Sequence, residues 1–301
     1  LPLTRNYFVI HVFLLGLMYA FMALAWNLLC GYGGQFSLGH HVFFGLGAYT
    51  TAVLLIYYDL TPWVGMLVGG LVSAAFAAAV GFPLFRLKSH WFTLASIAVA
   101  EIVKIIFINW KAVGAGKGLL LPVKPKSLYW LTFASPTPYY YIMLGFLAVE
   151  AIVIYALVKS KVGYYLQAIR DDEQAAMASG INPLKYKIIA FMISAFFVAI
   201  AGGFYTVKYR FIDPWSVMDI MICVDIALGA IVGGVYTFEG PIIGALIVIP
   251  ASYYVRAMLT PMLGLRFMGF HRVIFGAVLL GISLFASEGI MGYLREKKLI
   301  T

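Results

Sequence analysis

Charged residues are absent from long stretches of this chain. No Asp, Glu, Lys or Arg occurs between Arg5 and Asp59, between Asp59 and Arg86, or between Lys187 and Lys208. The same holds for three further stretches, residues 127–149, 240–255 and 273–287. About 20 consecutive apolar residues cross the hydrocarbon core of a bilayer as an α-helix. Several stretches reach that length, so the pattern predicts a protein that crosses a membrane many times.

The spanning segments are predicted to be helices. Inside lipid every backbone N–H and C=O must be paired within the protein, which leaves α-helices or closed β-barrels. A barrel would show strands of roughly ten residues with alternating polarity, and these stretches do not alternate. We predict an all-α polytopic membrane bundle, a single transmembrane domain over residues 1–301. Its roughly nine spans are expected near residues 7–29, 37–58, 62–85, 91–110, 139–158, 187–207, 218–235, 241–258 and 273–287.

Composition agrees with this prediction. The chain is 63% hydrophobic and 11% charged, whereas a soluble domain carries roughly 25% charged residues. The formal net charge is +9, but the basic residues are scattered, which favours contact with lipid headgroups over nucleic-acid binding. Cys30 and Cys223 both lie in apolar stretches, and we expect them to be small buried packing residues.

Two glycine-rich segments interrupt the apolar pattern. Residues 31–41 read GYGGQFSLGHH, and residues 229–244 contain Gly233, Gly234 and Gly240. Paired interruptions of this kind indicate discontinuous helices around a midplane site in transporters. The alternative is close packing of helices through small residues. The sequence leaves both interpretations open.

Several polar side chains are expected inside the spans. Glu101 and Lys104 lie three residues apart on one helix face, where they can pair with each other. A charge at the membrane centre costs about 2.5–3.5 kcal/mol on insertion scales, so it should face protein or water. We predict that the pair is either a structural bridge or part of a substrate path. The candidate substrate-path residues are Asn27, Gln35, Ser37, His40, Glu101 and Asp225.

Other roles are open to these polar residues. The polar groups around the first break can instead pair with backbone groups that an interrupted helix leaves free. Asp225 is isolated in the sequence and needs a partner or a wet cavity. No metal site is predicted, because His40 and His41 would diverge on a helix and no cysteine or carboxylate cluster accompanies them.

A polar segment, residues 159–187, separates two predicted spans. Asp171, Asp172 and Glu173 favour a helix N-terminus through the helix dipole. Gly180 suits the left-handed residue after a last turn, and Pro183 prevents continuation. The pattern predicts a short helix rich in small residues, which can sit deep in a groove of another protein. The alternative is an ordinary surface helix.

This short helix resembles the cytoplasmic coupling loop of ABC-importer permeases. The signature of that loop is Glu-Ala-Ala, three residues, then Gly. Ala175, Ala176 and Gly180 keep the spacing, whereas Gln174 stands at the glutamate position and Glu173 is one residue early. The resemblance implies contact with an ATPase through Arg170, Glu173, Gln174, Ala175, Ala176 and Gly180.

The wider resemblance is to the branched-chain amino acid permease family, of the LivM type. It covers nearly the whole chain, in the family's order. It is carried by AWNLL at 25–29, GYGGQFSLGH at 31–40, FFGLGAY at 43–49, FTLA at 92–95, AEIVK at 100–104, LGAIVGG at 228–234 and EGPIIGA at 239–245.

The resemblance implies an importer subunit in a prokaryotic inner membrane that works by alternating access. Its partners would be a second related permease, two ATP-binding subunits and an extracytoplasmic substrate-binding protein. ATP and Mg²⁺ would be bound by the ATPase subunits, and this chain would hold no cofactor. Family members have one more apolar segment before this point. With residues 159–187 cytoplasmic, Leu1 would lie outside, and the preceding span would place the N-terminus inside.

Three other functions are alternatives to this importer. Urea or short amides could travel through the same architecture. An ion-coupled secondary transporter would use Glu101 or Asp225 for protons. A membrane enzyme is disfavoured, because the sequence lacks a zinc-protease motif and a nucleophile elbow. Residues 114–118, GAGKG, lack the spacing and the Ser/Thr of a phosphate-binding loop, so this chain is not expected to hydrolyse ATP.

Overall fold

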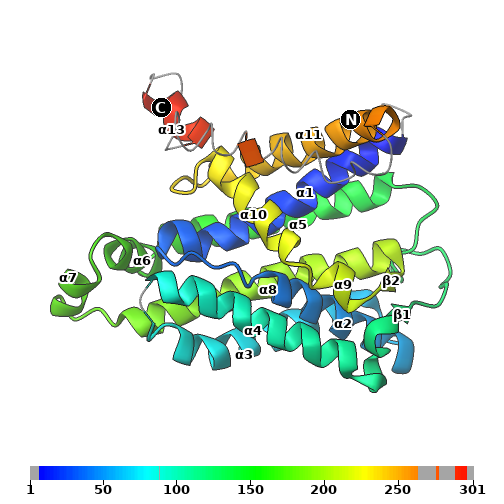
Figure 1. The fold of residues 1–301 in the computed structure, drawn as a ribbon, viewed down its shortest axis with the longest axis horizontal. Helices are drawn as coiled ribbons and strands as arrows, with labels where there is room; N and C mark the ends of the chain where they lie inside the picture. The colour runs from blue at the N-terminus through cyan, green and yellow to red at the C-terminus, as the bar shows by residue number, and fades with distance from the viewer. Residues whose placement is uncertain (1–6, 88, 264–275, 278–288, 297–301) are drawn as a thin grey trace. The chain divides into compact units, whose positions relative to one another are not determined.

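The computed structural model describes residues 7–87, 89–263, 276–277 and 289–296 (Figure 1). Within them the secondary structure is almost entirely helical, as predicted. Seven helical segments are long and apolar enough to cross a membrane, and His41–Tyr57 is a shorter apolar helix. These eight correspond to the first eight predicted spans. The ninth, 273–287, lies almost wholly outside the described residues.

The chain divides into two compact units. The first unit contains residues 1–27, 136–147 and 225–301. Its described helices are α1 (Tyr7–Asn27), the first half of α5 (Thr137–Val158), most of α10 (Ile220–Gly233), α11 (Gly240–Leu263) and α13 (Gly289–Glu296).

The first unit is held together by close helix contacts. Helices α1 and α11 pack along each other. Gly16 of α1 permits this approach, because a β-carbon there would lie 3.1 Å from the Pro250 ring. Small residues let membrane helices approach closely where larger side chains would hold them apart.

The second unit contains residues 28–135 and 148–224. A π-helical turn (Leu28–Tyr32) extends α1, and two very short strands, β1 (Leu119–Leu120) and β2 (Phe211–Ile212), pair antiparallel. The α-helices of this unit are α2 (His41–Tyr57), α3 (Pro62–Leu84), α4 (Ser89–Asn109), the second half of α5, α6 (Lys161–Asp171), α7 (Glu173–Ala178), α8 (Pro183–Tyr209), α9 (Pro214–Val217) and the start of α10; two short 3₁₀ turns cover Lys111–Val113 and Ala115–Lys117.

The core of the second unit is a three-helix packing of α2, α3 and α8. Glycines make it possible. A β-carbon on Gly202 of α8 would overlap the carbonyl oxygen of Phe44 and would lie 2.8 Å from the carbonyl carbon of the same residue. A β-carbon on Gly47 of α2 would likewise overlap the carbonyl group of Ala199. Backbone therefore touches backbone in this core.

The two glycine-rich segments turn out differently. The first is a true discontinuity, because residues 33–40 are not helical between the π-helical turn and α2. The second is the connection between α10 and α11, where Gly229 approaches Ala245 so closely that a β-carbon would lie 3.0 Å from its Cα atom. The second segment therefore fits the close-packing interpretation. A discontinuity that the sequence analysis did not single out lies at Met218–Asp219, between α9 and α10.

Candidate functional site

The polar segment 159–187 folds into two helices, α6 and α7, at one end of the second unit (Figure 1). The short helix predicted near Glu173–Gly180 is confirmed as α7, Glu173–Ala178. The carboxylate of Asp172 caps it by accepting hydrogen bonds from the backbone N–H groups of Gln174 (2.8 Å) and Ala175 (3.0 Å). Such a cap satisfies donors that the first helical turn leaves free.

The C-terminal end of α7 also follows the prediction. Gly180 adopts φ +82°, and its N–H donates to Met177 O while the N–H of Ile181 donates to Ala176 O. This is the usual left-handed helix stop. The next helix, α8, starts directly at Pro183, and Asn182 caps it. Asp171 differs from the prediction, because it ends α6 and forms an ion pair with Arg170 at 2.7 Å instead of starting α7.

Helix α7 exposes nearly all of its surface. Of its six residues only Ala176 is buried, and Met177 is 51% exposed. Gln174 and Ala175 are exposed as well, as is Gly180 beyond the helix. No described residue lies within 4 Å of a β-carbon built on Gly180. The helix thus presents a small, knob-like face that the described part of the chain leaves uncovered.

One ion pair ties α7 to the membrane-spanning helix behind it. The Lys187 Nζ of α8 lies 2.7 Å from the Glu173 Oε2. The Lys187 side chain is only 4% exposed, whereas the Glu173 side chain is 46% exposed. Lys187 was not singled out in the sequence, although its place five residues after the Asn182 cap puts it near the start of the long apolar helix α8. A buried lysine needs a paired carboxylate, so Glu173 is held by α8.

A second contact ties α6 to the first glycine-rich break. The Arg170 Nη1 donates to the carbonyl oxygen of Gly31 at 3.4 Å. Gly34, with φ +66°, lies against the same side chain, because a β-carbon there would be 2.8 Å from the Arg170 Cγ. The structure therefore brings a predicted coupling residue onto the predicted discontinuity.

The polar residues of the break pair largely with one another. The two ring nitrogens of His40 lie 2.9 Å from the Ser37 and Ser194 hydroxyl oxygens. Gln35 is buried, and its carbonyl oxygen accepts from the Cys30 thiol at 3.0 Å. The buried, fully paired His40 supports the structural alternative for these residues.

The Cys30 and Cys223 thiols are buried and free, as expected of packing residues. Cys223 Sγ lies 3.6 Å from the carbonyl oxygen of Ser37. Both thiols thus pack against the break.

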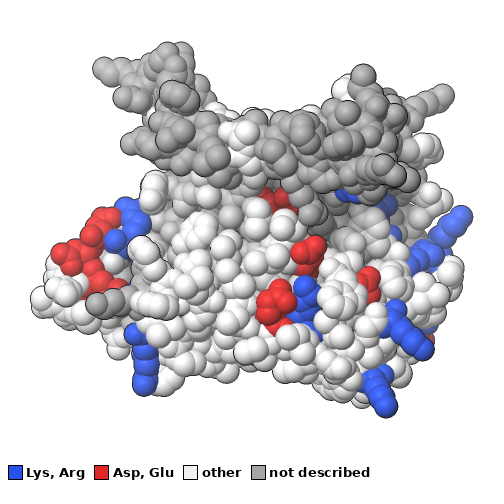
Figure 2. Space-filling view, viewed as in Figure 1, with Lys and Arg blue, Asp and Glu red and all other residues white. Residues whose placement is uncertain are grey.

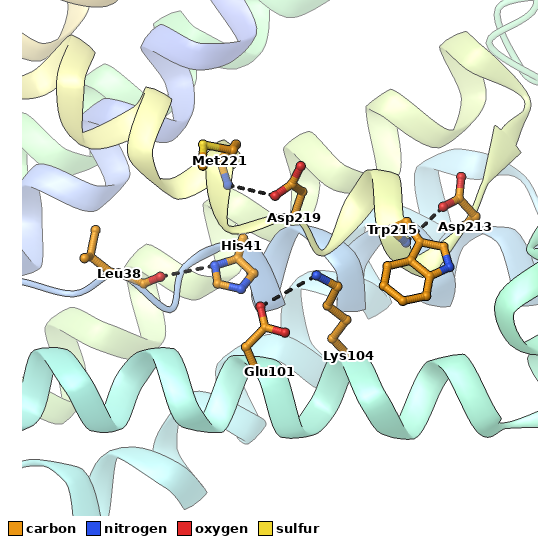
Figure 3. A network of polar contacts seen from close by, with 8 residues as sticks. All are labelled: Leu38, His41, Glu101, Lys104, Asp213, Trp215, Asp219 and Met221. Carbon is orange, nitrogen blue, oxygen red and sulfur yellow. Dashed lines mark hydrogen bonds and ion pairs between the residues drawn. The ribbon is translucent and has the colours of Figure 1, made fainter. Parts of the chain in front are cut away.

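Glu101 and Lys104 of α4 form the predicted pair, with Lys104 Nζ 3.6 Å from Glu101 Oε1 (Figure 3). Lys104 also lies over the Trp215 ring, 5.5 Å from its centroid. The Glu101 side chain is 39% exposed and that of Lys104 13%. Figure 2 shows acidic and basic side chains side by side over the middle of α4, apart from the charged groups near the left and right ends of this face.

Asn27 and Asp225, the remaining predicted residues, belong to the first unit. The Asn27 Nδ2 donates to the carbonyl oxygen of Thr237 at 2.9 Å. Among the described residues its Oδ1 has no hydrogen-bond partner, although the side chain is buried. Asp225 lies near enough to Tyr253 of α11 for the two side chains to interact electrostatically, so it has a neighbour in α11.

Sequence reasoning missed three polar residues that the structure makes prominent. Lys187 is the buried partner of Glu173, and Asp219 occupies the break between α9 and α10. Glu150 of α5 is fully buried, and within the described structure neither carboxylate oxygen has a hydrogen-bond partner. A charged residue close to an apolar run is a signal that could have identified each of them.

The apolar helices and the exposed helix α7 define a multi-pass α-helical membrane protein. The family model for "Branched-chain amino acid transport system / permease component" matches residues 8–283. The chain belongs to this family.

Three curated relatives illustrate the similarity. The LivM branched-chain amino acid permease protein of Salmonella typhimurium is 29% identical over 66% of this chain and 52% of its own length. The LivH permease protein of the same organism is 25% identical over 92% of both chains. The L-arabinose permease protein AraH of Escherichia coli is 28% identical over 58% of this chain and 51% of its own. The chain thus spans about half the length of the LivM and AraH relatives. No solved structure matches it.

Proposed function

We propose that this chain is the permease subunit of an ATP-driven importer for branched-chain or related small amino acids. The observation that carries the proposal is the exposed, capped helix α7 in a chain of this permease family. The partners would be a second related permease, two ATP-binding subunits and an extracytoplasmic binding protein. ATP and Mg²⁺ would be held by the ATP-binding subunits, and no chemical step would take place in this chain.

In this mechanism α7 is the docking element. The exposed face around Gln174, Ala175 and Gly180 would sit in a groove of the ATPase, which moves when the two ATPase subunits close on ATP. The Glu173–Lys187 ion pair would pass that movement to α8. The contact of Arg170 with Gly31 would pass it to the broken segment beside α2. The two contacts together would bias the permease between inward-open and outward-open states.

Reconstitution tests this function directly. The complex, purified with the products of neighbouring genes, is placed in vesicles with the binding protein, and uptake of leucine, urea and arabinose is measured with and without ATP. We expect ATP-dependent uptake of leucine. Uptake of leucine by this chain alone, driven by a proton gradient, would contradict the importer; preference for urea or arabinose would contradict the cargo class.

Gly180→Trp should uncouple ATP hydrolysis from uptake while the chain stays folded. A β-carbon built on Gly180 has no described atom of this chain within 4 Å, so the position has room for a larger side chain, and a bulky ring there would meet the docked partner. Any residue but glycine costs roughly 1 kcal/mol at this positive φ. Gly180→Ala carries that same strain without the bulk and is the matched control. We expect normal coupling in Gly180→Ala and uptake reduced at least about tenfold in Gly180→Trp; equal uptake in both variants would remove Gly180 from the interface.

A further inference from the structure

A mixed-charge cluster lies near the middle of the membrane span formed by α4. That span is His90–Asn109, so its midpoint falls between residues 99 and 100. At about 1.5 Å per residue, Glu101 lies roughly 2 Å and Lys104 roughly 7 Å from the midpoint along the helix. Charged groups at this depth must face protein or a water-filled cavity, and they mark the paths of substrates and ions.

Two helix breaks lie against α4. The segment before α2 runs along α4, because Thr93 Oγ1 donates to the carbonyl oxygen of Phe36 (2.6 Å) and Leu38 N donates to Ser96 Oγ (3.2 Å). The break between α9 and α10 also lies beside α4, which packs against α9. It carries Asp219. Transporter sites near the midplane are typically formed by helices that break in this way.

His41 has a ring nitrogen whose hydrogen bonding is not satisfied by the described residues. It is fully buried, and in the described part of the chain its Nε2 has no hydrogen-bond partner. Its Nδ1 lies 3.1 Å from the carbonyl oxygen of Leu38. A carbonyl oxygen can only accept, so Nδ1 carries the proton, and Nε2 of the neutral ring is then an acceptor. Nε2 therefore requires a donor.

The neighbours of His41 are carboxylates. In Figure 3 the imidazole lies between Asp219 and the Glu101–Lys104 pair, and its second nitrogen points away from Leu38. Lys104 and Asp219 are both close enough to act on the imidazole electrostatically. Lys104 is already engaged with Glu101 and the Trp215 ring. Asp219 accepts a hydrogen bond from Met221 N at 3.1 Å, and no described lysine or arginine forms an ion pair with it.

The cluster thus offers three acceptors and an excess of negative charge. When ionised, Glu101 and Asp219 carry two negative charges against the single positive charge of Lys104. A metal ion does not fit, because the described residues include no group of three His, Cys, Asp or Glu side chains placed to hold one. A group with several N–H donors and one positive charge matches the cluster.

We propose that His41 Nε2, Asp219 and Glu101 bind the ammonium group of the transported amino acid on its way through the membrane. The proposal rests on the proposed function and assigns the cargo-contacting residues that function requires. The site selects for a primary ammonium group and leaves the choice of side chain to other parts of the importer.

The test uses the assembled complex in nanodiscs, without the binding protein, whose own selectivity would hide that of the permease. Binding of leucine, isoamylamine and isocaproate is measured by the shift each causes in thermal unfolding across a concentration series. Isoamylamine keeps the ammonium group of leucine and lacks the carboxylate. Isocaproate keeps the carboxylate and lacks the ammonium group. We expect leucine and isoamylamine to stabilise the wild-type complex and isocaproate to have no effect.

Two nearly isosteric variants then locate the site. Asp219→Asn keeps an oxygen that can accept from Met221 N, and Glu101→Gln keeps the size of a partly exposed side chain. Each should weaken isoamylamine binding at least about tenfold, since a hydrogen bond to a charged group contributes about 1.5–3 kcal/mol. Asp213→Asn is the matched control. Asp213 caps α9 in the same network, but it is not one of the residues proposed to bind the ammonium group.

Unchanged binding in Asp219→Asn and Glu101→Gln, equal losses in Asp213→Asn, or stabilisation by isocaproate alone would overturn the proposal. Unfolding without ligand shows whether each variant is folded; where Asp219→Asn is not, Glu101→Gln decides. Wild-type uptake separates the two hypotheses. ATP-driven leucine uptake without ammonium binding contradicts this site alone, whereas ammonium binding without such uptake contradicts the proposed function alone.

Discussion

Replacing Lys187 by methionine should reduce ATP-driven uptake roughly tenfold or more while the importer still assembles and hydrolyses ATP. Methionine keeps the apolar stem of the buried side chain and removes the charge that holds Glu173 at 2.7 Å. Removing one partner of a buried pair costs about 3–5 kcal/mol, and the half-exposed Glu173 places this pair at the low end. Helix α7 would then move with its partner without pulling on α8.

The experiment compares uptake with binding-protein-stimulated ATP hydrolysis in the same vesicles. Lys185→Met is the matched control, because Lys185 lies two residues earlier in α8, is exposed and forms no ion pair among the described residues. The charge reversal Glu173→Lys with Lys187→Glu should recover part of the uptake that either single reversal loses. Full uptake in Lys187→Met, or no recovery in the double variant, would show that the pair transmits nothing.

Replacing Gly202 by leucine should prevent the second unit from folding. The leucine β-carbon would occupy space held by the backbone carbonyl of Phe44, 2.8 Å from its carbon atom. Ordinary overpacking of a core costs about 1–3 kcal/mol, and here no side chain can move aside, so the loss should exceed that range. The measurement is the fraction of the chain recovered as a monodisperse species from membranes, together with its unfolding temperature.

Gly145→Leu in α5 provides the contrast. No atom of the described residues lies within 4 Å of a β-carbon built on Gly145, and leucine favours a helix over glycine by roughly 0.8 kcal/mol. We expect Gly145→Leu to be recovered like the wild type. Phe44→Ala should not rescue Gly202→Leu, since the obstacle is backbone rather than the phenyl ring. Rescue by Phe44→Ala, or normal recovery of Gly202→Leu, would contradict backbone-to-backbone packing of α2 and α8.

The sequence predicted the helices more completely than their interruptions. Charge-free runs depend only on the energetics of lipid burial, which act on each segment separately, so eight spans could be located. The ends of α7 could be predicted for the same reason, because Asp172 and Gly180 act on their own backbone. The break at Met218–Asp219 carries no glycine or proline and had no such local signal.

The site was less predictable because its contacts join distant segments. Glu173 and Lys187 are 14 residues apart, and Arg170 meets Gly31 across 139 residues. The sequence-based prediction placed His40, and not the adjacent His41, among the substrate-path residues. The fold distinguishes them, since Ser37 and Ser194 satisfy both nitrogens of His40, while one nitrogen of His41 has no partner among the described residues. Which of two neighbouring histidines is free to bind depends on tertiary structure.

The inner and outer faces of the short helix α7 have different structural roles. On its inner face, Ala176 is buried and the Glu173 carboxylate pairs with Lys187 of α8. On its outer face, Gln174, Ala175 and Met177 are exposed. Substitutions on the outer face can therefore accumulate without disturbing the transmembrane core. Substitutions in the core can likewise accumulate without changing the outer face. After gene duplication, one copy could acquire a new cargo while both copies continue to share a single motor.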